Sequence, residues 1–211
     1  AFVGFGQFIL PAERRYDDDM PLANVASLLP YHNYVTGERA VETINTMIDY
    51  VNEGNRLFYD IYSETDKQAD SRKNNTGLFF FRGEPGKPFA IVCPGGGFSY
   101  VGAIHEGFPL AIALSRMGYN AFSIQYRTGG AQVACEDLAQ AIDFIMRHAE
   151  EYRYRPRTTR YGAALPEQEW PPISALTPHK DSSMQRTSVR LPSSWDIRDI
   201  RNTRRTIRLP T

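Results

Sequence analysis

The sequence contains little that would support a metal centre, a disulfide scaffold or a membrane span. Its 211 residues include only two cysteines, Cys93 and Cys135, too few for a disulfide framework or a cysteine-based zinc site. No apolar stretch approaches the roughly 20 residues that cross a bilayer. We therefore expect a soluble protein without metal or cofactor. Since the chain begins at Ala1, cytoplasmic, periplasmic and secreted locations all stay open.

Glycine and phenylalanine are nearly absent from the last part of the chain. Residues 153–211 hold one of the 16 glycines and none of the 12 phenylalanines. Residues 1–152 carry 12 basic and 19 acidic side chains, a net of −7, whereas residues 153–211 carry 12 basic and 5 acidic, a net of +7. We therefore divide the chain into an irregular segment 1–37, a folded part 38–152 and an Arg/Pro-rich tail 153–211 that we expect to be disordered or non-native.

The folded part alternates between strand and helix patterns. Apolar residues recur at helical spacing over 38–51, 108–117 (ending with Met117) and 133–152, and Asp137 lies on the polar face of the last of these. Strand patterns cover 57–62, 78–81, 89–93 and 120–126, and 66–75 reads as a charged, polar turn. Residues 57–62 alternate as an antiparallel strand does, and 89–93 form an unbroken apolar run typical of a strand buried on both faces. This order predicts an α/β fold with an open, doubly wound sheet.

A run of glycines follows the apolar stretch at 89–93. Pro94 precedes Gly95, Gly96 and Gly97, and a helical pattern begins near Phe108. Strand, glycine turn and helix form a layout that binds negative charge with backbone N–H groups. From these residues alone, an ordinary tight turn between strand and helix is equally open.

Two nucleotide-binding interpretations fit this run poorly. A dinucleotide fingerprint needs G-x-G-x-x-G, but Tyr100 stands where the third glycine is required. A phosphate-binding P-loop needs G-K-[ST], and the run has no lysine. The third interpretation is an oxyanion hole of the α/β-hydrolase kind, whose loop carries an H-G-G-G-type motif. Here Pro94 takes the place of the histidine.

The run I-V-C-P-G-G-G-F-S-Y-V-G-A-I-H-E-G-F-P-L-A, followed by a helix and by G-Y-N-A-F-S-I-Q-Y-R, resembles the esterase/lipase branch of the α/β-hydrolase superfamily. It is most similar to bacterial acetyl-esterases and to the acetylxylan- or feruloyl-esterase-like group, which combine P-G-G-G-[FY] with a later H-E-G. The resemblance covers approximately residues 56–152.

This resemblance implies a site and a chemistry. The oxyanion hole would be formed by Gly95, Gly96 and Gly97. Supporting loop residues would be Pro94, Phe98, His105, Glu106 and Gly107, with His105 orienting the loop by hydrogen bonding. The substrate would be a small acyl ester or an acylated saccharide, such as an acetylated or feruloylated plant polysaccharide.

The catalytic side chains of that family are missing from recognisable motifs. The fold requires a strand ending in G-x-S-x-G, followed by Asp or Glu and then His. No serine after Tyr152 has a glycine within two residues, and His179 precedes the aspartates of the tail, the reverse of the expected order. We therefore assign no catalytic residue and expect no esterase activity. We also expect the strands at 89–93 and 120–126 to lack covering neighbours.

Three interpretations of the tail remain. It can be a disordered basic tail, an arm that binds nucleic acid, or the same gene translated one base out of frame. Permitted codons for residues 160–171, translated from the third base of the Arg160 codon, give V-W-G-C-S-A-G-A-R-M-A, which contains a nucleophile elbow. The same shift allows M-G-Y-T-G-Y-S-E at 194–201 and D-P-P-T at 207–210. We favour a frameshift near Arg153.

The sequence therefore predicts the N-terminal part of a serine ester hydrolase, in a chain that is truncated or frameshifted and inactive. The alternative is a non-catalytic binding module whose arginine-rich arm takes nucleic acid or acidic glycan. The tail's 11 arginines motivate it, but they are scattered among prolines without a basic helix or an RNA-binding aromatic motif, so we do not expect a nucleic acid partner. A second alternative is a pseudo-hydrolase whose glycine loop binds a carbonyl or carboxylate ligand.

Overall fold

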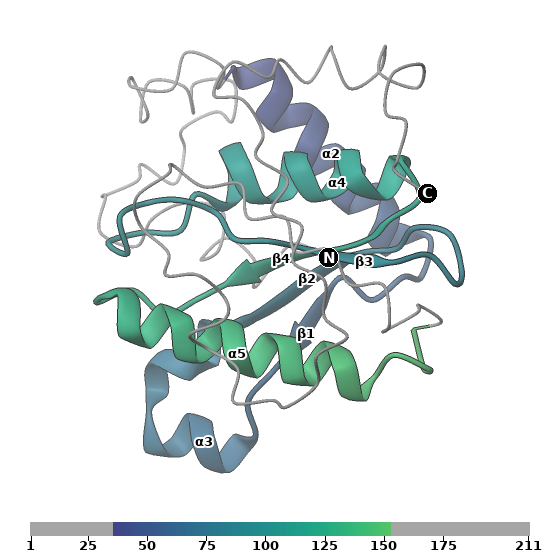
Figure 1. Ribbon diagram of the computed structural model, residues 1–211. Coiled ribbons are helices and arrows are strands. Elements are labelled where there is room, and N and C mark those ends of the chain that lie inside the picture. Colours follow the sequence, from purple (N-terminus) through teal and green to yellow (C-terminus); the bar gives the residue numbers. More distant parts are fainter. Residues whose placement is uncertain (1–35, 153–211) are drawn as a thin grey trace, which may run out of the picture.

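The computed structural model describes residues 36–152. Four strands form one mixed sheet with helices on both faces, so the fold class is α/β as expected (Figure 1). The expectations for the N-terminal segment and for the tail after Tyr152 lie outside the described residues.

The strand order in the sheet is β1-β2-β4-β3. Strand β1 (Phe58–Asp60) pairs antiparallel with β2 (Gly77–Phe81), and β2 pairs antiparallel with β4 (Asn120–Gln125). Strand β3 (Phe89–Val92) pairs parallel with β4. The expectation that residues 120–126 would lack a neighbour is therefore wrong, because β4 is an interior strand. Among the described residues, β1 and β3 form the two edges of the sheet.

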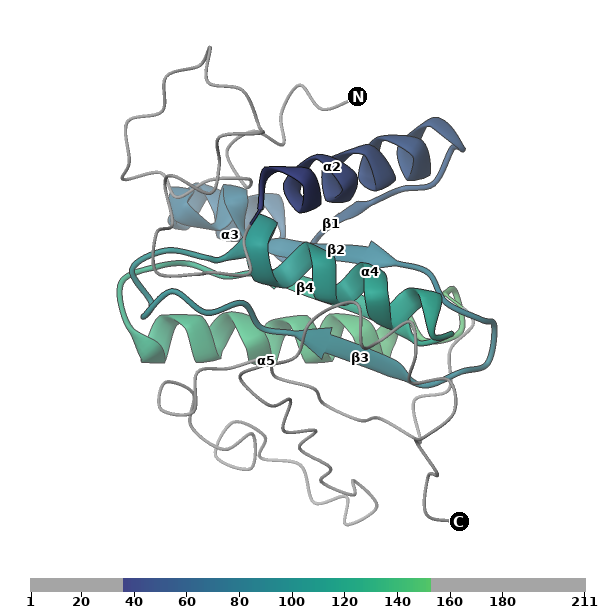
Figure 2. The same ribbon diagram turned by 90° about the horizontal axis from the view of Figure 1, so that it is seen from above.

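Each face of the sheet has its own hydrophobic core. Helices α2 (Gly37–Asn52) and α4 (Phe108–Arg116) cover one face, and α5 (Ala131–Arg147) covers the other (Figures 1 and 2). Alternate residues of β2 face opposite cores: Phe79 packs toward α4, whereas Phe80 stacks on Phe122 of β4 at 4.3 Å between ring centroids. This alternation explains why β2 lacks a polar residue, since both of its faces are buried.

The structure differs from the sequence-based expectations at several places, among them the end of α5 at Arg147 instead of Tyr152. The segment expected to be a turn forms a short helix α3 (Glu64–Ala69) and a 3-10 turn η2 (Ser71–Asn75); Ser63 begins α3 in a capping box with Asp66. Helix α4 ends at Arg116, so Met117 is 43% exposed rather than part of the apolar stripe. Asp137 is fully buried rather than on the polar face of α5. The other differences are local, whereas Asp137 is buried because an arginine from another element pairs with it.

Candidate functional site

The glycine run begins where β3 ends, beside the end of the parallel strand β4. Because the carboxyl ends of parallel strands meet at one edge of a sheet, the loops that follow them lie together, as at ligand sites of other α/β sheets. The loop after β3 runs from Cys93 to a π-helical turn, η3 (Ala103–Gly107), which leads into α4. The loop after β4 carries Tyr126 and two glycines before α5.

The peptide unit between Pro94 and Gly95 is held at both ends. The hydroxyl of Tyr126 donates to the Pro94 carbonyl oxygen at 2.8 Å. The N–H of Gly95 donates to Oε2 of Glu106 at 2.6 Å. A peptide unit whose C=O and N–H groups both have fixed partners cannot rotate without breaking one of these hydrogen bonds. We refer to Glu106, Tyr126 and this peptide unit as the peptide clamp.

The next two carbonyl groups of the loop are held by backbone N–H groups. The Gly95 carbonyl accepts from the N–H of Gly102 at 2.9 Å, and the Gly96 carbonyl accepts from the N–H groups of Ser99 at 3.0 Å and Tyr100 at 3.3 Å. In a trans peptide the C=O and N–H groups point in opposite directions, and no peptide among the described residues is cis. The held carbonyls of Gly95 and Gly96 therefore set the directions of the N–H groups of the following residues.

Glycine is required here by backbone conformation and by space. The φ angles are +137° at Gly96, +59° at Gly97 and +57° at Phe98, all in the region that L side chains rarely adopt. A Cβ atom on Gly96 would lie 2.1 Å from the carbonyl oxygen of Tyr100. Phe98 tolerates its positive φ because its carbonyl accepts from the Gly129 N–H at 2.9 Å and its ring contacts that of Tyr126.

The H-E-G motif is explained by contacts with the same loop. Besides Glu106, which holds Gly95, the buried ring of His105 lies so close to Gly102 that a Cβ there would be 2.9 Å from its Nε2. The same Nε2 is 3.8 Å from Oε1 of Glu106. A Cβ on Gly107 would lie 2.7 Å from Cγ of Pro94. The carboxylate that holds the loop is thus that of Glu106, while His105 fills space beneath Gly102.

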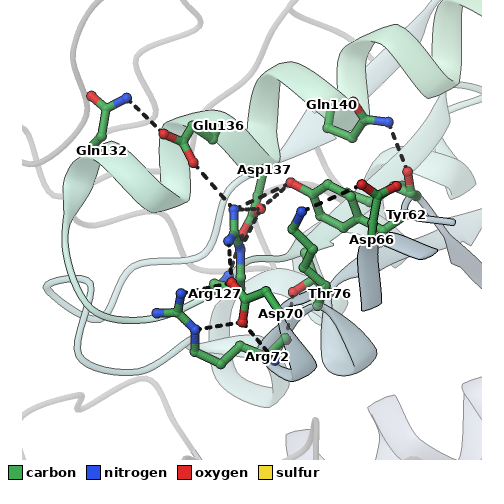
Figure 3. A network of polar contacts seen from close by, with 12 residues as sticks. Tyr62, Asp66, Asp70, Arg72, Thr76, Arg127, Gln132, Glu136, Asp137 and Gln140 are labelled. Carbon is green, nitrogen blue, oxygen red and sulfur yellow. Dashed lines mark hydrogen bonds and ion pairs between the residues drawn. The ribbon is translucent and has the colours of Figure 1, made fainter. Parts of the chain in front are cut away.

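A buried ion-pair network anchors the segment that carries Tyr126 (Figure 3). Arg127 donates from its backbone N–H to Oδ2 of Asp137 at 2.6 Å and from Nη2 to Oδ1 at 2.8 Å. The same carboxylate accepts from the hydroxyl of Tyr62 at 2.6 Å, and Nη1 of Arg127 reaches Asp70 at 2.9 Å. The network therefore joins the end of β4 to α5 and to the residues around α3.

Burial and ion pairing fix the protonation states of these groups. Burial and the hydrogen bond to Asp137 raise the pKa of Tyr62, so its hydroxyl stays protonated and donates. Burial lowers the pKa of Arg127, but its hydrogen bonds to Asp137 and Asp70 outweigh that effect and raise the pKa overall. The hydrogen bond from Arg72 holds the pKa of Asp70 well below its ordinary range. Since these groups satisfy one another, we assign the network a structural role.

Cys93, which directly precedes the loop, is not a nucleophile. Its side chain is buried, and that burial, with a smaller effect of Cys135, raises the pKa of the thiol to about 12. The thiol therefore stays protonated near neutral pH, whereas cysteine reacts as the thiolate. Within residues 36–152 no group of three or more His, Cys, Asp or Glu side chains could hold a metal ion.

The structure brings together the predicted loop residues Pro94, Gly95, Glu106 and Gly107. It also adds Asp137, together with Tyr126 and Arg127, which in the sequence are only the last two residues of G-Y-N-A-F-S-I-Q-Y-R. No local sequence pattern predicts that Asp137 is buried with partners, because Tyr62 and Arg127 lie 75 and 10 residues away from it.

A hollow of about 420 Å³ lies between α2 and α4, but none of the loop residues lines it. In the same described range, no helix combines the length and apolarity that a bilayer crossing requires.

No protein-family model matches the sequence, and no curated protein does. Among solved structures, the chain is similar to an acetyl ester-xyloside bifunctional hydrolase from Caldicellulosiruptor lactoaceticus, at 21% identity and a TM-score of 0.45, over 50% of this chain and 41% of that one. It is also similar to an alpha/beta hydrolase from a Medee basin deep-sea metagenome, at 18% identity and a TM-score of 0.43, over 51% of this chain and 45% of that one. A carboxylesterase from Lactobacillus plantarum matches at 22% identity and a TM-score of 0.36, over 42% of this chain and 36% of that one. The chain thus spans less than half the length of these solved hydrolases.

Proposed function

We propose that residues 36–152 are the N-terminal part of a serine ester hydrolase of the α/β-hydrolase superfamily, and that the glycine loop is its oxyanion hole. The substrate class is a small acyl ester or an acylated saccharide. The reaction is acyl transfer to a serine that this chain lacks, followed by hydrolysis.

The observation that carries this proposal is the orientation of the loop's peptide units. The carbonyl of Pro94 accepts a hydrogen bond from Tyr126, and the carbonyls of Gly95 and Gly96 accept hydrogen bonds from N–H groups within the loop. Backbone N–H groups with fixed directions stabilise a developing oxyanion without reorganising during the reaction. The Gly95 N–H donates to Glu106. The donors that we propose for the oxyanion are the N–H groups of Gly96 and Gly97, which follow the held carbonyls, together with that of the residue after the serine.

We further propose that the part bearing the serine is encoded one base out of frame. Extending the shift upstream, permitted codons for residues 155–161 give P-E-N-Y-S-V-W, directly before G-C-S-A-G. Y-S-V-W suits a short strand, and a strand followed by G-x-S-x-G is the layout of a nucleophile elbow. The shifted frame therefore allows the next strand and the nucleophile at the place where both are required.

The nucleotide sequence across codons 148–165 and beyond codon 211 is the first test. We expect that one inserted or deleted base restores V-W-G-x-S-x-G and, downstream, an aspartate and a histidine. If the frame is intact across these codons, the out-of-frame origin of the tail is wrong.

Hydrolysis of p-nitrophenyl acetate by the chain and by its frame-repaired counterpart is the second test. We expect the chain to match the buffer rate, since loss of the triad removes most of the catalytic effect. The repaired protein should hydrolyse the ester, and a serine-directed phosphonate should abolish its activity. Phosphonate-sensitive hydrolysis by the present chain, or an inactive repaired protein, would contradict the proposal.

A binding module with an arginine-rich arm remains a second candidate only through residues outside the described ones. The described residues offer no observation that favours it, and among them Arg127 is buried in an ion-pair network. Retention of the chain on heparin that falls with salt would support this candidate.

A further inference from the structure

We propose that Glu106 and Tyr126 are positioning residues, which set the directions of the loop's N–H donors by holding the Pro94–Gly95 peptide unit from both sides. This inference rests on the proposed function for its catalytic consequence. The clamp itself is a property of the present chain.

The two side chains come from independent parts of the fold. Glu106 belongs to η3, which precedes α4, and Tyr126 follows β4 and is anchored through its neighbour Arg127. Tyr126 is 3% exposed, and the side chain of Glu106 is 16% exposed. Hydrogen bonds in such surroundings are worth more than at the surface, and one to a carboxylate more than one to a neutral acceptor.

The clamp acts on the donors through the chain's own connectivity. The hydroxyl of Tyr126 lies 2.8 Å from the Pro94 carbonyl and 3.4 Å from those of Gly95 and Tyr100, so it contacts both ends of the loop. Glu106 keeps the Gly95 N–H turned toward η3. If either contact is lost, this peptide unit can rotate. The Gly95 carbonyl, whose direction sets that of the Gly96 N–H, is then held by the Gly102 N–H without support from the preceding peptide unit.

Amide hydrogen exchange of the present chain tests the clamp without any activity. The variants are Glu106→Leu, which removes the acceptor, Glu106→Gln, which keeps one, and Tyr126→Phe, which removes the donor. Tyr119→Phe, just before the start of β4, is the matched control. We expect Glu106→Leu to speed exchange at Gly95 by at least about tenfold, Glu106→Gln to stay within about threefold, and Tyr126→Phe to speed exchange at Gly102 and Tyr100.

The amides of β2 and β4 report whether a variant still folds. If they keep their protection while the Gly95 amide exchanges equally in Glu106→Leu and the parent chain, the clamp is overturned. The Gly95 amide resonance gives an independent reading. It should lie downfield, as an N–H bonded to a carboxylate does, and move upfield in Glu106→Gln. An unmoved resonance would also overturn the clamp.

The catalytic consequence is tested in the frame-repaired protein. We expect Glu106→Leu and Tyr126→Phe to lower kcat for p-nitrophenyl acetate by at least about tenfold with KM little changed, because oriented donors act on the transition state. Glu106→Gln, which keeps an acceptor for the Gly95 N–H, should retain most of the parent kcat. If kcat stays at the parent value in Glu106→Leu, the positioning role is wrong although the esterase function stands. If the unsubstituted repaired protein is inactive, the proposed function is wrong. The hydrogen-exchange data then still test whether the clamp holds the loop.

Discussion

Gly107 lies where the η3 turn meets both the glycine loop and the sheet. A Cβ atom there would lie 2.5 Å from Oγ of Ser123 on β4 and 2.7 Å from Cγ of Pro94. The Pro94 ring is rigid, and Oγ of Ser123 can move only by rotation of a short, buried side chain, so a methyl group would have to push the turn away from Pro94 and β4. The last residue of H-E-G is therefore a packing glycine, and its lack of a side chain brings Glu106 within reach of Gly95.

We predict that Gly107→Ala lowers the free energy of unfolding by about 1–3 kcal/mol. Urea denaturation followed by far-UV circular dichroism measures the change. The double variant Gly107→Ala/Ser123→Ala should lose less than the sum of its single changes, because removing Oγ relieves the closest contact. Equal stability of Gly107→Ala and the parent chain would show that the turn has room to move.

At the scale of elements, the Arg127–Asp137 pair joins β4 to the helix that covers the sheet. Asp137 is fully buried, and its two oxygens accept from Arg127 and Tyr62. Removing Asp137 leaves Arg127 with Asp70 and Glu136 but takes away the acceptor of its Nε and Nη2 groups. A buried charge that loses such a partner costs far more than the pair itself contributes. Asp143, on the same helix, pairs with Arg147 at the surface instead.

We predict that Asp137→Ala lowers the free energy of unfolding by about 3–5 kcal/mol, whereas Asp143→Ala changes it by less than about 1 kcal/mol. Chemical denaturation of both variants under the same conditions gives the comparison. Similar losses in the two variants would mean that the Asp137 carboxylate contributes no more than a surface charge.

Asp70 adds a pH dependence to the same network. The hydrogen bond from Arg72 is the largest cause that holds the pKa of Asp70 below its ordinary value of 3.8. Because the folded state binds this proton less readily than the unfolded state, the contribution is present above about pH 4 and is lost as pH falls further. We predict that stability declines below pH 4 and that Asp70→Asn reduces this slope. If the stability of Asp70→Asn falls with pH as steeply as that of the parent chain, Asp70 does not cause the decline.

At the scale of the whole molecule, the helix positions determine where the next strand belongs. Crossovers between parallel strands are right-handed in nearly all proteins. The β3–α4–β4 crossover uses the face covered by α4, and α5 lies on the opposite face (Figure 2). A right-handed crossover through α5 must therefore run back from β4 toward β3 and past it.

We predict that in the frame-repaired protein the strand ending in the nucleophile elbow pairs parallel with the open side of β3. This placement would put the serine beside the glycine loop, since the carboxyl ends of parallel strands share one edge. Comparing amide exchange in the two proteins checks it: the N–H groups of β3 that do not bond to β4 should gain protection after repair. No gain at β3 would place the new strand elsewhere.

The sequence by itself determined the alternation of strands and helices and the position of the glycine loop, because apolar periodicity and glycine runs are local signals. The strand expected at 89–93 is β3 (Phe89–Val92), and 38–51 form most of α2.

Only the tertiary structure decided which side chains hold the loop and which charges are buried. Tyr126 reaches Pro94 across 32 residues of sequence, and Tyr62 reaches Asp137 across 75. Helical spacing alone places Asp137 on a polar face, and no local pattern distinguishes it from Asp143 on the same helix. They differ because Arg127, at the end of β4, lies beside Asp137 and not beside Asp143. The packing of elements distant in sequence thus sets which charges the protein buries.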